Sequence, residues 1–439
     1  MIKLVKGNWM KKINELSNYI KEGKLDEKLK DIYVDGNKLA YQRDRYVEAL
    51  SEYARIFAYG NGDAEVSIYS APGRSEIGGN HTDHQHGNVL AASINDDALA
   101  IVGNKNSDKV RVLSKGYDMI TIDMDKLEKD DSEEGTTVAI IKGVIYGIKQ
   151  AGYEIGGFDA YITSDVLSGS GLSSSAAFET IIGTIISGMY NEMKIDAVEI
   201  AKLGQYAENV YFGKPCGLMD QMACSVGSLC QIDFKDPENP VIDRVEFDLA
   251  AQGYILCITD TKGSHADLTP DYAAVPFEMK QVAACFGKEV LRDVSKEELM
   301  SGINKIRKEC GDRAALRALH FVAEDERAVL EAKALKEGDF DEFLKLFKAS
   351  GDSSFKYLQN VYTNHDVMHQ NVSVGLCVSE AVLGNSGVAR VHGGGFAGTM
   401  QAFVKNEKVE EYKKAMDELY GEGSCNVLMI RKYGGIKVA

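Results

Sequence analysis

A loop rich in glycine and serine, GSGLSSSAA from Gly169 to Ala177, constrains the fold of this chain more than any other segment. Residues 158–166 before it have the apolar and aromatic composition of a strand. After it, apolar side chains recur at the spacing of an amphipathic helix: Phe178, Ile181, Ile182, Ile185 and Ile186. At the start of a helix the first N–H groups have no intrahelical partner and the macrodipole is positive, so an anion is stabilised there. The segment predicts a phosphate-binding loop, with a simple helix cap after a glycine turn as the alternative.

Two widespread phosphate loops do not fit this segment. A Walker loop carries a Lys-Ser/Thr pair after its last glycine, and the dinucleotide-binding fingerprint has a glycine at the place of Ser174. The loop therefore indicates a nucleotide site of another type.

The composition is that of a soluble globular protein. Hydrophobic residues make up 44% of the 439 residues and charged residues 26%, and no apolar run is long enough to span a bilayer. At about 100–200 residues per domain, this length predicts two domains. The formal net charge of −16 argues against nucleic acid, whose phosphates need clustered Lys and Arg. The eight scattered cysteines and the polar, Lys-rich N-terminus indicate a reduced, cytoplasmic protein without a signal peptide.

Three regions can be distinguished along the chain. Residues 1–60 are charged and helical in pattern, with an apolar stripe that we expect to dock on the body of the protein: Tyr46, Ala49, Leu50, Tyr53, Ala54 and Phe57. Strand-like runs follow over 66–122, and then helices lead to the strand before the phosphate loop, an α+β order rather than a regular βαβ alternation. The polar segment 234–240, which contains two prolines, predicts a boundary between residues 61–235 and residues 236–439.

The segment 71–87 concentrates polar side chains among glycines. It contains an arginine, an aspartate and three histidines: Arg74, His81, Asp83, His84 and His86. Histidine and aspartate at this spacing can ligate a metal, or they can hydrogen-bond to the hydroxyls of a sugar. The short spacing of rigid polar groups favours the sugar over the metal.

Two carboxylates downstream are candidates for chemistry. Glu208 lies on the apolar face of an expected helix, where a carboxylate must bind a cation or form a buried salt bridge. Asp220 lies among glycine, methionine and cysteine, where desolvation would raise its pKa, and a solvated turn is the alternative. A last glycine cluster, 392–399, joins two expected strands. Its bare backbone permits the close approach of a ligand or forms a tight hairpin.

In this order, the segments together resemble one family. Gly73–Asp83 is similar to the galactokinase signature, Gly169–Ala177 to the ATP loop of GHMP kinases and Gly393–Gly398 to their third motif. The run from Ala207 to Gln221 is nearly as specific. Over nearly all of residues 45–439 the chain therefore resembles a GHMP small-molecule kinase of the galactokinase family.

The resemblance implies an α+β, two-domain GHMP kinase fold. The N-terminal domain would be a ribosomal-protein-S5-domain-2-like α/β domain with a left-handed crossover, the C-terminal domain would be ferredoxin-like α+β, and the site would lie between them. The implied reaction converts D-galactose and ATP to galactose 1-phosphate and ADP, with Mg²⁺ as cofactor. The partners would be a small-molecule sugar and ATP, without nucleic acid or membrane, and we expect a monomer or weak dimer.

The resemblance also assigns roles to the candidates. Asp220 would take the proton of the anomeric hydroxyl, and Arg74 would steady the developing charge. The sugar would be bound by His81, Asp83 and Tyr272. Mg²⁺ would be held by Ser175 and Glu208. The triphosphate would be bound by Gly169, Ser170, Gly171, Leu172, Ser173, Ser174 and Ser175.

The chain departs from the family at the residue before His81. Galactokinases usually have a glutamate there that receives the 6-hydroxyl of the sugar, whereas this chain has Asn80, which we also assign to substrate binding. An amide removes the charge that would repel a carboxylate at C6, so kinases of galacturonate, arabinose or N-acetylgalactosamine are alternatives. A non-catalytic sensor of galactose and ATP is an alternative of another class. The features that argue against it are Arg74, Ser175, Ala176, Glu208 and Asp220.

Overall fold

The computed structural model describes residues 10–166, 171–263 and 268–439. Its strands are β1 Lys11–Lys12, β2 Glu65–Gly78, β3 Asn88–Ser107, β4 Lys109–Ser114, β5 Ile120–Asp123, β6 Gly157–Ser164, β7 Leu229–Asp233, β8 Val241–Val245, β9 Tyr254–Asp260, β10 Gly387–Val391, β11 Thr399–Lys405, β12 Cys425–Leu428 and β13 Ile436–Lys437. Its helices are α1 Ile13–Lys21, α2 Asp26–Tyr33, α3 Leu39–Phe57, α4 Thr137–Gln150, α5 Ser174–Tyr190, α6 Ala197–Tyr206, α7 Met219–Val226, α8 Thr269–Ala284, α9 Lys296–Ser301, α10 Ile303–Glu309, α11 Asp312–Glu337, α12 Phe340–Ser353, α13 Asn371–Leu383 and α14 Val409–Tyr420. Two π-helical turns, Ala207–Phe212 and Ser354–Leu358, follow α6 and α12.

The first sheet has nine strands in the order β1-β2-β3-β6-β4-β5, with β13 beside β2 and with β7 and β8 continuing from β3. The pairing of β4 with β6 is parallel, and the other pairings are antiparallel. The 20-residue strand β3 pairs with β6 along one half and with β7 along the other. The strand that carries the first polar motif, β2, is therefore an interior strand.

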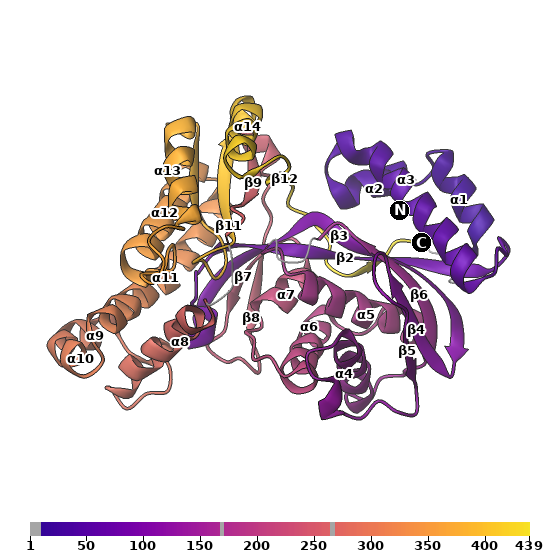
Figure 1. The fold of residues 1–439 in the computed structure, drawn as a ribbon, viewed down its shortest axis with the longest axis horizontal. Coiled ribbons are helices and arrows are strands. Elements are labelled where there is room, and N and C mark those ends of the chain that lie inside the picture. The colour runs from indigo at the N-terminus through magenta and orange to yellow at the C-terminus, as the bar shows by residue number, and fades with distance from the viewer. Residues whose placement is uncertain (1–9, 167–170, 264–267) are drawn as a thin grey trace.

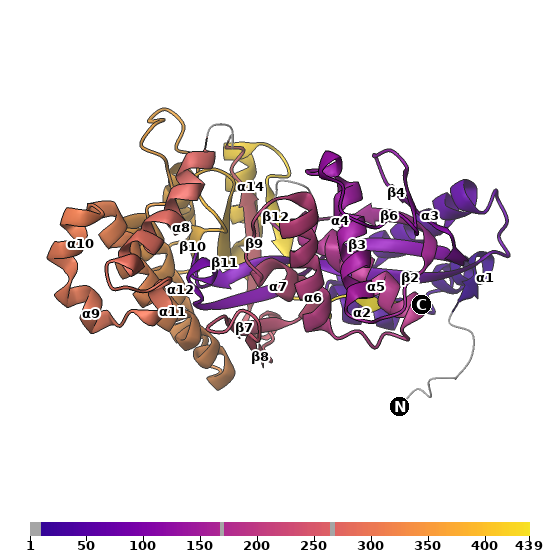
Figure 2. The ribbon, with the colours of Figure 1, turned by 90° about the horizontal axis from the view of Figure 1, so that it is seen from below.

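Alternate residues of β3 enter two different cores. Ala100 and Val102 face the core formed with α4, α5 and α6, whereas Leu99 and Ile101 face the core formed with α1, α2 and α3. Successive side chains of a strand point to opposite faces, so an uninterrupted apolar run marks a strand that is covered on both. Figure 1 shows α1–α3 above the sheet and α4–α7 below it, and Figure 2 shows the lower helices from beneath.

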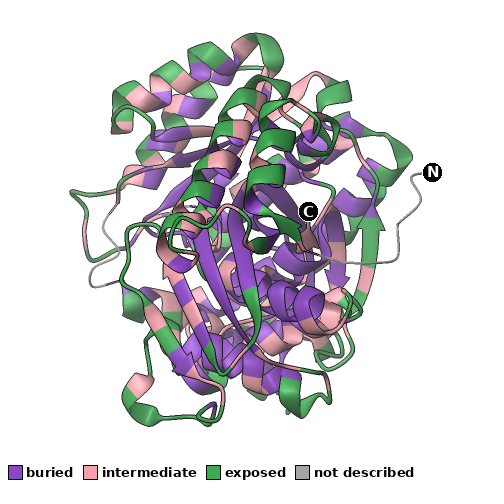
Figure 3. Cartoon of the chain, turned by 90° about the vertical axis from the view of Figure 1, so that its right-hand side faces the viewer, coloured by how far each residue is buried: buried purple, intermediate pink, exposed green. Residues whose placement is uncertain are grey.

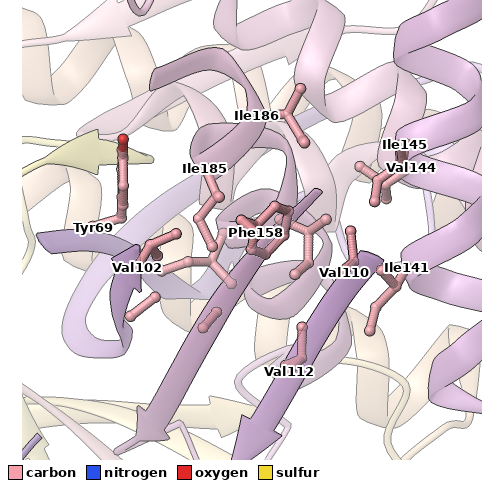
Figure 4. Close-up of a cluster of buried hydrophobic side chains, with 14 of the residues drawn as sticks. Tyr69, Val102, Val110, Val112, Ile141, Val144, Ile145, Phe158, Ile185 and Ile186 are labelled. Atoms are coloured by element: carbon pink, nitrogen blue, oxygen red, sulfur yellow. The ribbon is translucent and has the colours of Figure 1, made fainter. Parts of the chain in front are cut away.

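The core below the first sheet is built mainly from branched aliphatic side chains, with the buried aromatic rings of Phe158 and Tyr69 among them. Phe158 of β6 lies among Ile185 and Ile186 of α5, Val110 of β4 and Ile141 of α4 (Figure 4). The helical spacing in the sequence thus marks the core-facing side of α5, and the predicted helix is confirmed. Buried residues follow the strands and the inner helix faces, with exposed residues on the outside (Figure 3).

The N-terminal helices cover the upper face of the same sheet. The stripe predicted in α3 packs there through side chains that are 8% exposed or less: Tyr46, Ala49, Leu50, Tyr53 and Phe57. The expectation that this stripe docks on the body is confirmed. The sheet is therefore a middle layer with helices on both sides.

The second sheet has four antiparallel strands in the order β10-β11-β9-β12. Its residues also alternate, because Cys257 and Ala402 face α13 and α14, whereas Leu256 and Phe403 face α12 and the first sheet. The chain passes from the first sheet to the second between Val245, the end of β8, and Tyr254, the start of β9. The last strand, β13, returns to the first sheet. The boundary predicted at residue 236 lies before β8, a strand of the first sheet. Within the described ranges, no helix combines the length and apolar character of a membrane span.

Candidate active site

The centre of the candidate site is an ion pair between β2 and α7. Arg74 lies on β2 and Asp220 in the first turn of α7. Arg74 Nε and Nη2 donate to Asp220 Oδ1 and Oδ2, both at 2.7 Å. The Arg74 side chain is 9% exposed and that of Asp220 33%, so the pair is open to solvent on the aspartate side. Two parallel bonds between a planar guanidinium and a carboxylate fix the orientation of both groups.

Arg74 also holds the phosphate loop. Its backbone N–H donates to Leu172 O at 3.0 Å, and its Nη1 donates to Gly171 O at 2.6 Å. Gly73 permits this close approach, because a Cβ there would lie 2.8 Å from Leu172 O. Arg74 therefore joins the polar segment 71–87 to the phosphate loop.

Helix α5 begins directly after this contact. Ser173, with φ +56°, donates its hydroxyl to Asp220 Oδ2 and makes no side-chain cap for the helix. The first N–H groups of α5 are thus left uncapped, as anion binding requires. Ser174 and Ser175 form the first turn and line a cavity. Two residues of the predicted loop lie outside the described residues: Gly169 and Ser170.

The charge of Asp220 is set by these neighbours. Burial alone would raise its pKa, but the charge and hydrogen bonds of Arg74, together with the hydroxyl of Ser173, bring the pKa below its ordinary value. The increase expected from the sequence context is therefore wrong, because that context did not contain the arginine partner. Asp220 is ionised at neutral pH.

A cavity of about 760 Å³ lies at the start of α5. Its walls come from the β4–β5 turn, the start of α4, the end of β6 and the first turns of α5. Apolar and aromatic walls are formed by Ile120, Val138, Ile140, Phe178, Phe212 and Tyr117. A largely apolar chamber that ends at a helix N-terminus has the shape and polarity for a planar base attached to phosphates. Sequence reasoning missed these residues, because they lie on separate segments without a local motif.

The polar segment 71–87, called the sugar motif below, continues from β2 into the turn before β3. His81 Nε2 lies 3.1 Å from Gly394 O, and burial together with a neighbouring histidine lowers the pKa of His81 to about 4. The Asp83 side chain is 13% exposed, and a Cβ added at Gly217 would overlap its Oδ2. Asp83 therefore contacts the segment that leads into α7, three residues before Asp220.

Asn80 lies deeper than His81 and Asp83 and is 0% exposed. Its Nδ2 donates to Glu76 Oε1 at 2.9 Å and to Gly393 O at 2.8 Å. Its Oδ1 accepts from Ser354 Oγ at 3.1 Å and from Asn360 Nδ2 at 2.9 Å. An asparagine amide offers two donor and two acceptor positions, so all of them are used within the protein. Contact between Asn80 and a sugar would require one of these bonds to open.

The glycine cluster joins the antiparallel strands β10 and β11, as the hairpin alternative predicted. It also permits close approach, because Tyr272 from the start of α8 packs against it. Tyr272 Oη donates to Gly395 O at 2.7 Å, and a Cβ at Gly394 would lie 2.7 Å from the ring. Burial raises the pKa of Tyr272 to about 12, so its hydroxyl keeps its proton. The cluster contacts both Tyr272 and the sugar motif.

Glu208 lies in the π-helical turn after α6 and is 4% exposed. Its Oε1 accepts from Lys214 Nζ at 3.0 Å, and its Oε2 accepts from Gln221 Nε2 at 2.9 Å. The structure thus contains the salt bridge that was the alternative to a metal ligand. Gln221 Nε2 also donates to Glu179 Oε2 at 3.0 Å, and burial together with the charge of Glu208 raises the pKa of Glu179 well above its ordinary value.

Mg²⁺ prefers oxygen ligands, and it usually takes only one or two of them from the protein and the rest from phosphates and waters. Glu208 supplies a carboxylate and Ser175 an exposed hydroxyl. The buried Oε1 of Glu179 has no hydrogen-bond partner among the described residues. In the same ranges, no three His, Cys, Asp or Glu side chains form a metal centre by themselves. The residues present fit a Mg²⁺ shared with nucleotide phosphates.

Comparisons with known proteins agree with this geometry. The profile of the GHMP kinases N terminal domain matches residues 139–228, and the galactokinase galactose-binding signature matches residues 52–104. Methanococcus jannaschii mevalonate kinase has the same fold, with a TM-score of 0.58 at 16% identity over 83% of this chain and 98% of that one. The matched family models and this fold define a GHMP kinase with two α+β domains.

Similar proteins indicate which family of GHMP kinases this chain belongs to. The galactokinase of Glaesserella parasuis is 31% identical over 373 residues, covering 84% of this chain and 92% of the relative. The galactokinase of Streptomyces coelicolor is 29% identical, covering 80% and 88%. The crystal structure of Lactococcus lactis galactokinase complexed with galactose has a TM-score of 0.74 at 27% identity, covering 89% of this chain and 99% of that one. This chain belongs to the galactokinase family.

Proposed function

We propose that the protein transfers the γ-phosphoryl group of ATP to the anomeric hydroxyl of D-galactose, giving galactose 1-phosphate and ADP. The observation that carries this proposal is the Arg74–Asp220 ion pair, which contacts the phosphate loop through Arg74 and is exposed on the side of Asp220. The family supports galactose as the substrate, since the relatives are galactokinases and one of them was crystallised with galactose.

The nucleotide half of the site is the cavity beside α5. In this proposal the adenine lies against the apolar walls, and the phosphates meet the first N–H groups of α5 and the hydroxyls of Ser174 and Ser175. Backbone N–H groups and a helix dipole bind a polyanion without clustered lysines. An acidic protein can therefore bind ATP at this point.

The sugar half comprises His81, Asp83 and Tyr272. Because burial and a neighbouring histidine lower the pKa of His81 to about 4, its imidazole is neutral at physiological pH. Its Nε2–H donates to Gly394 O, which leaves Nδ1 to accept a hydrogen bond from a sugar hydroxyl. The Asp83 carboxylate can accept bonds from two adjacent hydroxyls. We assign Asn80 to positioning this motif, since its amide already bonds to the glycine loop and to Asn360.

The reaction forms a bond between the sugar O1 and Pγ, breaks the bond between Pγ and the bridging oxygen of ADP, and moves the hydroxyl proton to Asp220. Phosphoryl transfer depends mainly on alignment and charge neutralisation. The lowered pKa makes Asp220 a weak base, so the proton leaves late, when O1 has become acidic through bonding to phosphorus. Arg74 holds the carboxylate in line and offsets negative charge.

Mg²⁺ would be held by Ser175 and Glu208 together with the phosphates, and it would supply neutralisation of phosphate charge. To hold the ion, Glu208 would exchange its bond to Lys214, whose side chain is 64% exposed, for a bond to the metal. The protein residues keep their roles in binding and alignment.

The proposal is tested by turnover with ATP and Mg²⁺ on galactose, galacturonate, N-acetylgalactosamine, L-arabinose and glucose. We expect ADP release to be fastest with galactose and phosphorus NMR to place the new phosphate on O1. A faster reaction with another sugar would overturn the substrate. Binding of ATP and galactose without transfer to any sugar would instead indicate a sensor.

A further inference from the structure

The N-terminal helices reach the strand end from which the phosphate loop starts. Asp165 lies just after β6, and its side chain is 19% exposed. Tyr41 Oη of α3 donates to Asp165 Oδ1 at 2.8 Å, and Arg45 Nη1 lies 3.0 Å from Asp165 Oδ2. Tyr41 and Arg45 are four residues apart, so they project from the same side of α3. Two side chains of one helix thus hold one carboxylate beside the loop.

Arg45 joins this contact to the middle of the sheet. The residue is 5% exposed, and its Nη1 donates to Asp97 Oδ1 at 2.6 Å. Its Nη2 donates to Asp97 O at 2.9 Å and to Thr163 O at 3.1 Å. Asp165 N in turn donates to Asp97 O at 2.9 Å. The middle of β3 and the end of β6 are therefore fixed to α3 by buried, charge-assisted hydrogen bonds.

The strand end held in this way forms part of the nucleotide cavity. Thr163, Ser164 and Val166 line the cavity. Val166 also lies under the first motif, since a Cβ at Gly73 would come within 3.0 Å of its side chain. A shift of residues 163–166 would therefore change the cavity wall and the distance between the phosphate loop and Arg74.

The same contacts balance the charge of three neighbouring carboxylates. Asp96, Asp97 and Asp165 are close together, and each has a cation as partner: Lys38 at 3.9 Å from Asp96, Arg45 and Arg431 on Asp97, and Arg45 on Asp165. Without Arg45, the carboxylates would face an incoming polyanion with less compensation.

We propose that Tyr41 and Arg45 are positioning residues for the nucleotide site, which they align by holding Asp165. The inference rests on the proposed function, because the nucleotide is the ligand whose site they align. It gives the N-terminal helices a role in ATP binding in addition to covering the sheet.

The test compares Tyr41→Phe and Asp165→Asn with the matched control Tyr433→Phe. Tyr433 Oη donates to Asp31 of α2, so the control removes a similar Tyr–Asp bond of the N-terminal helices away from Asp165. We expect the two test variants to raise the KM for ATP about threefold or more, the scale of one lost hydrogen bond, with the KM for galactose unchanged. The control should leave both constants unchanged.

Calorimetric titration of ATP into each protein without sugar gives a readout that does not depend on turnover. The dissociation constant should rise by the same factor as the KM. An unchanged ATP affinity in both test variants, or an equal change in the control, would overturn the positioning role. If the wild type bound ATP but phosphorylated no sugar, the proposed function would fail while this comparison still decided the inference.

Discussion

Asp220 accepts hydrogen bonds from Arg74 and from Ser173, and these bonds determine how its replacement will act. Asp220→Asn keeps the shape of the side chain but removes the charge and the proton acceptor. We expect kcat to fall by roughly 10² or more, the range for a positioned base, with ATP and galactose still bound. Stopped-flow turnover and calorimetric binding measure the two effects separately. The control is Asp236→Asn in an exposed loop, and a loss of binding with unchanged kcat would contradict the assignment.

The hydrogen-bond partners of Asn80 require an amide at this position. Asn80→Glu would remove both donor bonds and place a carboxylate against the carboxylate of Glu76 and the carbonyl of Gly393. We expect a stability loss of roughly 3 kcal/mol and a kcat/KM for galactose reduced about tenfold or more. Thermal unfolding and steady-state kinetics measure both.

A second variant distinguishes this explanation from a direct sugar contact. Glu76→Gln combined with Asn80→Glu should recover part of the lost stability, because the new amide can donate to the new carboxylate. A single Asn80→Glu variant with unchanged stability and a lower KM for galactose would instead mean that residue 80 contacts the sugar.

Helix α11 carries a buried carboxyl group that has no catalytic role in this proposal. Glu331 is 0% exposed, and neither carboxyl oxygen has a hydrogen-bond partner among the described residues. Burial and the charge of Glu324 raise its pKa well above the ordinary value. The folded protein therefore keeps this proton while the unfolded chain releases it above about pH 4.3. Between about pH 4.3 and the raised pKa of Glu331 in the folded state, the free energy of unfolding falls by about 1.4 kcal/mol per pH unit.

Glu331→Gln should remove this pH dependence. We expect the variant to unfold at a higher temperature than the wild type at pH 8, with a smaller difference at pH 5. Scanning calorimetry at both values measures the difference, and Glu326→Gln on the exposed side of α11 is the control. An equal difference at both pH values would show that Glu331 is ionised in the folded state.

Individual helices and strands could be predicted from the sequence, because their apolar spacing is a local pattern. The apolar spacing after Ala177 predicted α5, and the stripe from Tyr46 to Phe57 predicted α3 and its buried face. The two strands expected on either side of the glycine cluster 392–399 are β10 and β11. The cavity walls and the pairing of Asp220 with Arg74 were not predictable from local pattern, because they join segments that only the folded chain brings together. Arg74 and Asp220 are 146 positions apart in the sequence, so local context gave the wrong direction for the pKa shift of Asp220.

The two sheets share one core. Leu90 and Ile94 of β3 pack with Leu256 and Ile258 of β9, and Phe403 joins them. The Phe403 ring lies 5.2 Å from that of Phe343 and 4.9 Å from that of Phe347, centroid to centroid. A shared apolar core makes the two halves unfold together, whereas halves joined only by a linker would unfold separately.

Phe403→Ala should therefore lower one cooperative transition instead of splitting it. We expect a loss of about 3–5 kcal/mol, as for other buried aromatic residues. Near-UV circular dichroism and scanning calorimetry should give the same midpoint in the variant. Phe277→Ala, at a side chain that is 60% exposed, is the control, and two separated transitions would mean that the halves are stabilised independently.

The return of β13 to the first sheet determines the order in which this protein can be completed during synthesis. Lys437 and Ile436 pair with Tyr69 and Ser70 of β2, the strand that carries Arg74. These residues leave the ribosome after every strand of the second sheet, so an edge of β2 stays unpaired until then. An open strand edge is a template for association with other chains. The N-terminal half of a nascent chain therefore cannot finish folding before the C-terminal half has emerged, and fragments released early would carry an exposed edge beside the unfinished active site.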